Sequence, residues 1–376
     1  MATSRRALAI LSPLAMLAVF CESGCGGSVA ADSGPADGGP AGGDAAGADA
    51  AAESCTTGPC PITLASGYYP ITIAVDATSV YWGNKGCTNG FPGDRSVMKV
   101  PVGGGTVTTL ASNQDPVVLT VDATNVYWTD AFGCSTGDPG DVAEGSGTVM
   151  KMALDGGTPT TLVPWGPFAP QGIAVDATSV YWADFQGPAA VLTVPVGGGT
   201  PTSLAPFPQV WGLGTACDAV AVDATSLYWV TGSAVSSLPL DGGTPITLWQ
   251  GQPVIDAFAL DAENVYWGTS DGAVMMVPKS GGTASTLASG LGAIWSMAVD
   301  SKNVYWGTGE GLMRMPVGGG TPTMLASGLP VAIALDATSV YWAGSGPLCQ
   351  RSCPVPARLG LRQWRASTQG ASEVQP

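Results

Sequence analysis

Short runs of apolar residues, each ended by turn-forming residues, follow one another along most of this chain, and one pattern recurs. Each copy has an apolar strand ending in Asp, a tight turn such as the one at Asp76, and a strand carrying adjacent Tyr and Trp. Short apolar segments separated by turns at a regular period predict a β repeat protein. The seven copies are marked by the pairs Tyr81-Trp82, Tyr127-Trp128, Tyr181-Trp182, Tyr228-Trp229, Tyr266-Trp267, Tyr305-Trp306 and Tyr341-Trp342.

The spacing of the copies predicts the size of the repeated unit. The Asp residues before the pairs stand 36 to 54 residues apart, which brackets the length of a four-stranded propeller blade. After each pair come a variable loop, a third strand and, in six copies, a glycine turn before a fourth strand. Glycine suits such turns because tight hairpins need positive φ at their centre. We therefore predict an all-β fold, a seven-bladed β-propeller of four-stranded blades.

The strand that the seventh copy lacks is found at the other end of the chain. Residues 61–67 (PITLASG) copy residues 322–328 (PTMLASG), which form the fourth strand of the sixth copy. We expect this N-terminal strand to complete the last blade and close the ring, which leaves no open sheet edge. The third strand of that blade is expected near residues 352–356, and residues 357–376 are expected to form a disordered tail.

The first 54 residues predict an export signal and a tether. Arg5 and Arg6 precede an apolar run over residues 7–20 that is short for a membrane span, which is typical of a signal segment, here within residues 1–25. Residues 26–54 are rich in Ala, Gly and Asp, with too little apolar bulk to fold. The propeller is accordingly expected over residues 55–356.

Two resemblances can now be stated. The motif of Asp, four or five residues and Tyr-Trp, with Tyr127-Trp128-Thr129-Asp130 as the nearest copy, resembles the YWTD propeller repeats of lipoprotein-receptor ectodomains over residues 61–356. Those domains typically have six blades, so the resemblance implies the architecture but not the blade number or the partners. The chain also resembles bacterial repeat lipoproteins of unknown function, which implies no activity.

The end of the signal segment leaves two fates open. Gly24-Cys25-Gly26-Gly27 resembles the end of a bacterial lipoprotein signal, which would make Cys25 the lipidated residue. Glu22 stands where that pattern has an aliphatic residue, so ordinary cleavage and release stays open as well. The protein is expected either on the bacterial cell envelope, through a lipid anchor, or in the secreted fraction.

The repeated aromatic and acidic residues are expected to be structural. Residues in the same place in every blade are explained by the same packing, so we expect the seven Trp residues of the pairs to be buried between blades. An exposed aromatic binding surface is the alternative. The seven Asp residues are expected to accept hydrogen bonds from turn N–H groups. A ring of metal ligands is the alternative, and it requires these side chains to converge on the central channel.

In each blade, two connections lie on the same face of the propeller: the one from the second to the third strand, and the one from the outer strand to the next blade. Both vary from blade to blade. This face is the predicted ligand-binding surface, since aromatic residues outside the repeat are typical of binding anchors; plugging of the channel mouth is the alternative. The acidic loop on this face, residues 130–147, lacks the Asp-x-Asp-x-Asp-Gly spacing of calcium-binding loops. Solvated carboxylates are therefore favoured over Ca²⁺ binding, and no cofactor is expected. The candidates are Trp165, Phe168, Phe207, Trp211, Trp295, Asp138, Asp141 and Glu144.

Seven cysteines after the leader, Cys217 among them, predict disulfides in an exported protein, with one cysteine left over. Cys87 and Cys134 occupy similar places after their Tyr-Trp pairs in neighbouring blades, which favours a bridge between them. The four cysteines near the chain ends would bridge across the ring closure or within each close pair, and both pairings stay open. These four are Cys55, Cys60, Cys349 and Cys353. Zinc binding is disfavoured because the spacings are unusual.

Charge and composition narrow the function. A net charge of −15 with 13 basic residues disfavours nucleic acid, and a membrane is expected to be met only through a lipid anchor. The absence of His removes Ser-His-Asp and His-zinc chemistry. We expect a non-catalytic binding module for a protein, peptide or glycan. The alternatives are a carboxylate-dependent or Ca²⁺-assisted hydrolase or lyase, marked by two carboxylates sharing a pocket, and a surface protein without a ligand.

Overall fold

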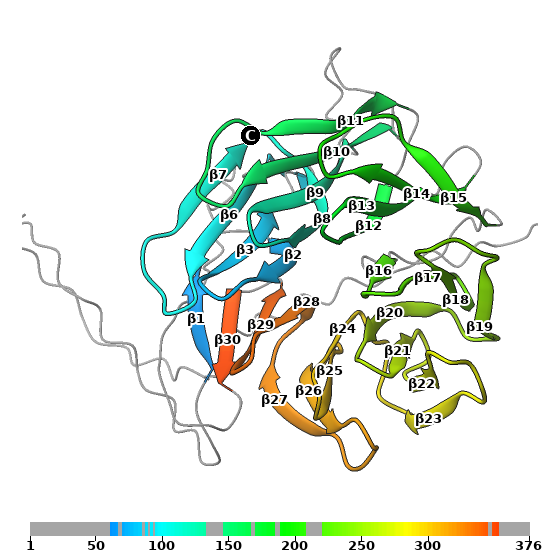
Figure 1. The fold of residues 1–376 in the computed structure, drawn as a ribbon. Coiled ribbons are helices and arrows are strands. Elements are labelled where there is room, and N and C mark those ends of the chain that lie inside the picture. The colour runs from blue at the N-terminus through cyan, green and yellow to red at the C-terminus, as the bar shows by residue number, and fades with distance from the viewer. Residues whose placement is uncertain are drawn as a thin grey trace, which may run out of the picture.

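The computed structural model describes residues 61–66, 70–84, 87–88, 91–92, 95–132, 146–166, 170–184, 189–207, 220–344 and 348–352. These residues form an all-β protein in which four-stranded antiparallel sheets are arranged as the blades of a β-propeller (Figure 1). Seven such sheets are present, in the orders β2-β3-β6-β7, β8 to β11, β12 to β15, β16 to β19, β20 to β23, β24 to β27 and β28-β29-β30-β1. None of the described residues belongs to a helix with the length and apolarity needed to cross a bilayer.

The inner two strands of each blade carry the repeated sequence pattern. The inner strands are β2 (Pro70–Val75), β8 (Pro116–Val121), β12 (Pro170–Val175), β16 (Val220–Val222), β20 (Ile255–Leu260), β24 (Ser296–Val299) and β28 (Pro330–Leu335). The second strands, which contain the Tyr-Trp pairs, are β3 (Ser79–Asn84), β9 (Asn125–Phe132), β13 (Ser179–Asp184), β17 (Ser226–Thr231), β21 (Asn264–Thr269), β25 (Asn303–Gly307) and β29 (Ser339–Gly344).

The outer two strands follow the variable loop and the glycine turn. The third strands are β6 (Ser96–Pro101), β10 (Ser146–Ala153), β14 (Ala190–Pro195), β18 (Ala234–Pro239), β22 (Val274–Pro278), β26 (Gly311–Pro316) and β30 (Leu348–Ser352). The outer strands are β7 (Thr108–Ser112), β11 (Thr160–Gly166), β15 (Thr202–Pro206), β19 (Ile246–Gln250), β23 (Ser285–Ala288), β27 (Thr323–Ser327) and β1 (Ile62–Ala65).

The two ends of the chain meet in one sheet. Strand β1 pairs antiparallel with β30, with Ile62 opposite Gln350 and Thr63 opposite Cys349. Figure 1 shows this contact as the blue β1 beside the orange β30. The outer edge of the last blade is therefore supplied by the start of the chain, which is the ring closure that the copied PITLASG sequence predicts.

One predicted feature was wrong, and two further features of the architecture were not expected from the sequence. The third strand of the last blade is β30, which ends at Ser352, so the expected strand at residues 352–356 was placed too late. A two-stranded ribbon of β4 (Cys87–Thr88) and β5 (Phe91–Pro92) adds a sheet that is not part of a four-stranded blade. The circle is also less uniform than predicted. Inner strands lie side by side at six junctions, whereas β20 meets the fourth blade mainly through β17 because β16 has only three residues.

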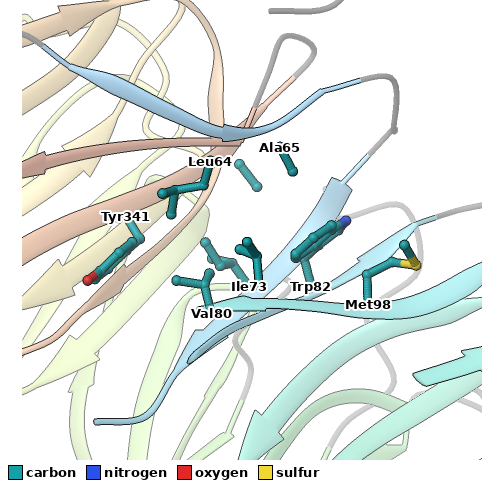
Figure 2. Close-up of a cluster of buried hydrophobic side chains, with 9 residues drawn as sticks. Leu64, Ala65, Ile73, Val80, Trp82, Met98 and Tyr341 are labelled. Atoms are coloured by element: carbon teal, nitrogen blue, oxygen red, sulfur yellow. The ribbon is translucent and has the colours of Figure 1, made fainter. Parts of the chain in front are cut away.

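The core consists of seven clusters of buried side chains, one at each junction between blades. Each cluster contains the Tyr of one blade and the Trp of the next, as with Tyr341 and Trp82 (Figure 2). Adjacent strand residues face opposite sides of a sheet, so each pair reaches both neighbouring blades. The other combinations are Tyr81 with Trp128, Tyr127 with Trp182, Tyr181 with Trp229, Tyr228 with Trp267, Tyr266 with Trp306, and Tyr305 with Trp342.

Close packing between blades also depends on glycine after the Tyr-Trp pair. A Cβ on Gly83 would lie 2.6 Å from the Pro116 ring at the start of the next inner strand, and one on Gly268 would lie 2.3 Å from a methyl group of Ile294. Both distances are well below van der Waals contact. Glycine at these positions therefore lets the next inner strand approach the sheet.

Replacing one repeated Trp should strongly destabilise the fold. Trp267 is fully buried, so Trp267→Ala is expected to cost about 3 to 5 kcal/mol of unfolding free energy through lost burial and a new cavity. Urea denaturation followed by circular dichroism would measure this cost. The matched control is Trp295→Ala, because Trp295 is 43% exposed and lies outside the repeat. Equal losses for the two variants would contradict the assigned packing.

Candidate functional site

The blades present two different ends. We call one end the loop face, where second strands turn into third strands and outer strands cross to the next blade. We call the other end the turn face, which carries the Asp turns and the glycine hairpins. Because the turn face repeats almost unchanged from blade to blade, chemistry specific to one ligand has to come from the loop face or from the channel.

On the turn face the repeated Asp residues hold their own turns. In the second blade, Asp122 Oδ1 accepts hydrogen bonds from the backbone N–H groups of Thr124 and Asn125 at 2.6 and 2.7 Å. Its Oδ2 accepts a hydrogen bond from the Tyr127 hydroxyl at 2.7 Å. The same Tyr-to-Asp bond recurs in five other blades. This confirms that the Asp residues cap turns, and their oxygens are engaged within their own blades instead of converging on the channel.

These hydrogen bonds decide the protonation of the capping carboxyls. Burial by itself raises the pKa of Asp122, but the hydrogen bonds from the turn and from Tyr127 outweigh it, so the pKa falls below its ordinary value. In the first blade, burial and the bond to Asp76 raise the pKa of the Tyr81 hydroxyl to about 12. Carboxylate and phenol therefore keep opposite proton states across the neutral pH range.

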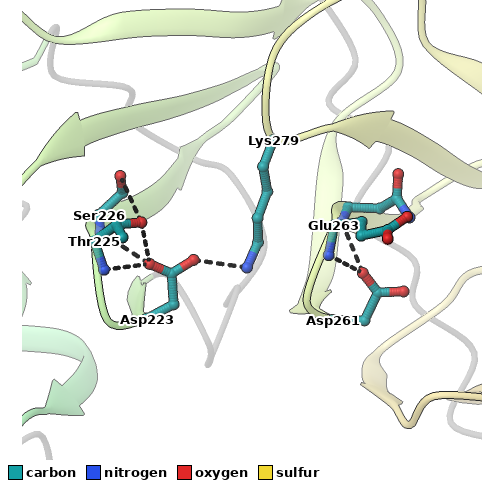
Figure 3. A network of polar contacts seen from close by, with 7 residues as sticks. Asp223, Thr225, Ser226, Asp261, Glu263 and Lys279 are labelled. Carbon is teal, nitrogen blue, oxygen red and sulfur yellow. Dashed lines mark hydrogen bonds and ion pairs between the residues drawn. The ribbon is translucent and has the colours of Figure 1, made fainter.

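The fourth blade departs from this pattern. Lys279, from the fifth blade, donates to Asp223 Oδ2 at 2.7 Å (Figure 3). Its ammonium group also lies 5.0 Å from the centre of the Tyr228 ring. Burial works against ionisation of Asp223, but the Lys279 bond and the turn N–H groups hold the pKa of this carboxyl far below its usual range. The ion pair joins the fourth and fifth blades at the junction where the inner strands make little contact.

Capping residues such as Asp122 should make stability fall at acid pH. Folding lowers the pKa of Asp122, so its carboxylate stabilises the fold above the ordinary Asp pKa of about 3.9, and this stabilisation is lost as pH falls through the lower folded value. Asp122→Asn is expected to cost about 1 to 3 kcal/mol at pH 7 and clearly less at pH 3. Urea denaturation at constant ionic strength would measure both values. A cost that does not change with pH would contradict the assigned role of the carboxylate.

The central channel is apolar over part of its length. A cavity of about 330 Å³ is lined by residues from the inner strands of the fourth to seventh blades, including Phe258, Met297, Ile333 and Leu335. Every lining residue is apolar. The channel therefore lacks side chains that would orient a polar ligand there.

The loop face carries a second cavity of about 330 Å³, beside the sixth blade. Its walls come from the crossing between β23 and β24, from the turn between β25 and β26, and from β26 itself. The crossing supplies Leu291 and Trp295, the turn supplies Glu310, and β26 supplies Met313. Apolar side chains, an exposed indole ring and one carboxylate thus meet in a single hollow of the size that small ligands occupy.

The residues around Trp295 hold it on the surface of the loop face. The residues on either side of it are buried: Ile294 packs against Gly268 of the fifth blade, and Ser296 donates a hydrogen bond to the carbonyl of Pro330 at 2.7 Å. The backbone N–H group of Trp295 donates a hydrogen bond to the Gly307 carbonyl at 3.0 Å. The backbone of Trp295 is therefore held in place on the loop face, and the residue is 43% exposed.

Two further carboxyls lie under the loop face between the first and second blades. Asp115 and Asp130 are 2% and 3% exposed, and the Asp115 N–H group donates to Asp130 Oδ1 at 2.7 Å. Arg95 forms an ion pair with Asp115 at 3.2 Å. Burial, helped by the charge of Asp115, raises the pKa of Asp130 to about 6, while the N–H bond and Arg95 act in the opposite direction.

Asp130 should have the opposite pH dependence to the capping residues. A carboxyl whose pKa is raised by folding stabilises the protein only while it is protonated, so stability is lost as pH rises from about 4 through 6. Asp130→Asn keeps an acceptor for the Asp115 N–H group and removes the buried charge. Relative to wild type, we expect the variant to gain up to about 3 kcal/mol between pH 4 and pH 8. Denaturation at pH 4, 6 and 8 would measure this, and the Asp122→Asn series is the control with opposite sign.

The predicted site residues lie in different surroundings, and many of them lie outside the described residues. Trp295 lines the loop-face pocket, whereas Phe207 is half-buried against the cluster between the third and fourth blades and so contributes to packing. Trp165, Cys87 and Cys349 lie in β11, β4 and β30, where only the backbone is described. Outside the described residues lie Phe168, Trp211, Asp138, Asp141, Glu144, Cys25, Cys55, Cys60, Cys134, Cys217 and Cys353.

Two groups of candidate residues escaped the sequence analysis. Glu310 lies in a turn so short that it looked uniform, although it is the one charged residue between Gly307 and Gly311. Asp115 precedes the proline that starts an inner strand, a place where other blades have no acid, and Asp130 is the last residue of the YWTD copy. Their signal was a departure from the repeat, which is weaker than a motif.

Comparison with known proteins supports the fold and little more. The chain matches no protein-family model, and the search of curated proteins returned no relative. Among solved structures, the extracellular domain of a one-component system from B. thetaiotaomicron aligns with a TM-score of 0.56 and 11% identity over 77% of this chain and 39% of that chain. The computationally designed protein Ika8 aligns with a TM-score of 0.54 and 13% identity over 77% and 98% of the two chains.

A chain from the nidogen/laminin complex also aligns, with 18% identity over 59% of this chain and 86% of that chain, but its TM-score of 0.45 carries no argument. Identities this low show the fold alone. The class of protein is therefore a β-propeller.

Proposed function

We propose that this protein is an exported, non-catalytic binding module whose loop face holds a protein, peptide or glycan ligand. The observation that carries the proposal is Trp295, a fixed and exposed indole ring that lines a hollow on the face where the blades differ. Aromatic anchors in such hollows contribute much of the free energy at binding surfaces. The export signal expected in residues 1–25 sets the place of action at the envelope or outside the cell.

The relationship to known repeats is part of the same proposal. We place the chain with propellers of the YWTD type because each blade combines the capping Asp with the Tyr-Trp pair, and with bacterial repeat lipoproteins through Cys25. Anchoring by Cys25 would hold the module at the envelope, whereas cleavage without lipidation would release it. Metabolic labelling with a fatty acid, with and without Cys25→Ala, would separate these two fates.

A carboxylate-dependent hydrolase or lyase is the second candidate, and Asp115 with Asp130 is the observation that favours it. Both carboxyls are almost completely buried, and Asp115 is paired with Arg95. Neither of them lines the channel cavity or the loop-face cavity described above. A catalytic pair has to reach its substrate, so this geometry supports binding better than hydrolysis.

Removing the indole ring should remove the binding without unfolding the protein. Wild type and Trp295→Ala would be compared on glycan and peptide arrays, and each ligand found would be titrated by calorimetry. We expect the variant to bind at least about 10-fold more weakly, because truncation of an anchor typically costs 2 kcal/mol or more. Ile246→Ala, which alters an exposed apolar residue on the outer strand β19, is the control.

Equal binding by Trp295→Ala and wild type would contradict the assigned site. A folded wild-type protein that binds nothing on either array would instead favour a surface protein without a specific ligand.

A further inference from the structure

The loop-face pocket beside the sixth blade has a composition that narrows its ligand. Leu291, Trp295 and Met313 give it apolar walls, and its rim is formed largely by glycine, which offers no side chains. Glu310 is the one ionisable residue among those that line it. A ligand that fills the hollow therefore meets hydrocarbon, the face or edge of an indole ring, and a single negative charge.

The other polar side chain in the pocket is engaged in its own turn. The Thr308 hydroxyl accepts a hydrogen bond from the Glu310 N–H group at 3.2 Å and lies 3.4 Å from the Gly311 carbonyl, and the residue is only 3% exposed. Glu310 is exposed, and neither of the ion pairs among the described residues involves it. Its carboxylate is thus the lining side chain that a charged ligand would meet.

Among the described residues, those next to the pocket add negative charge. Exposed Asp271 precedes Gly272, whose backbone packs against Leu291 and Gly292 at the pocket edge. Arg314, the nearest basic residue along β26, follows Met313 and so faces the opposite side of that sheet. The whole chain has a net charge of −15, which attracts cations toward this surface.

From this geometry we infer that the Trp295 and Glu310 pocket binds the cationic side chain of a lysine or arginine in a peptide or protein ligand. This inference rests on the proposed function and names its ligand class. An alkyl stem lies against Leu291 and Met313, the cationic head is attracted by the indole ring, and Glu310 pairs with its charge. A neutral sugar is a poorer fit because it needs several directed hydrogen bonds, and Glu310 is the one lining side chain placed to supply them.

The test compares a cationic probe with two neutral ones. Wild-type protein would be titrated by ligand-observed NMR with Nα-acetyl-lysine methylamide, with its norleucine analogue, which keeps the four-carbon stem but lacks the ammonium group, and with N-acetylglucosamine. We expect the lysine probe to bind several-fold more tightly than norleucine and the difference to shrink as salt rises. The glucosamine probe is expected to bind more weakly than the lysine probe.

Two variants assign the effect to the pocket. Glu310→Gln is expected to weaken the lysine probe roughly 2- to 5-fold and to leave norleucine unchanged, as loss of one exposed charge pair implies. Glu263→Gln makes the same change at an exposed position on the turn face and is expected to alter neither. Trp295→Ala is expected to weaken both probes.

The outcomes separate the two proposals. Equal binding of lysine and norleucine, tighter binding of the sugar, an unaffected Glu310→Gln variant, or no binding of the lysine probe at all would overturn the assignment to cations. If the cation assignment fails but Trp295→Ala weakens the binding of any probe or array ligand, the proposed binding function stands and only the ligand class is wrong. If Trp295→Ala binds every ligand as wild type does, the binding function fails as well.

Discussion

The structure depends on the burial of two aromatic rings from every blade, the Tyr at the junction with one neighbouring blade and the Trp at the junction with the other. The Tyr of one blade and the Trp of the next share a cluster, so no blade completes its own core and each requires both neighbours. At each of these two junctions a blade buries large aromatic surface, which is the main favourable term available to short strands. In three blades glycine follows the pair, and at Gly83 and Gly268 the lack of a Cβ lets Pro116 or Ile294 of the next blade approach the sheet closely.

The Asp caps connect this packing to the two faces of the molecule. In six blades the carboxylate that fixes the turn also accepts a hydrogen bond from the hydroxyl of the buried Tyr, so the polar end of that ring is satisfied where it reaches the surface. Because this network fixes the turn residues, the turn face has nearly the same sequence and structure in every blade. The connections on the loop face are not part of the network, so their sequences are free to differ. Trp295, Glu310 and the Asp115 pair all lie there, and each departs from the repeat.

Sequence reasoning was strongest where one interaction occurs many times. The Tyr-Trp burial, the Asp caps and the pairing of residues 62–65 with the last blade all follow from repetition, because a repeated pattern has a repeated cause. Strand β30 was placed too late because it lacks the glycine turn that marks the others. Trp295 could be selected as a lone aromatic, but Glu310 could not, since a single charge in a short turn has no pattern. Which residues share a pocket depends on how segments distant in the chain cross, and periodicity does not report this.

Closure of the ring by β1 also has a consequence for the order of events during synthesis. Ile62 pairs with Gln350, so the two partners are 288 residues apart, and the last sheet stays incomplete until almost the whole chain has emerged. Six blades can assemble from neighbours as they appear, whereas the first strand must wait, unpaired, for the final one. A chain truncated before β30 would leave two exposed strand edges that invite association with other copies. Synthesis through β30 is in this way a condition for a closed ring.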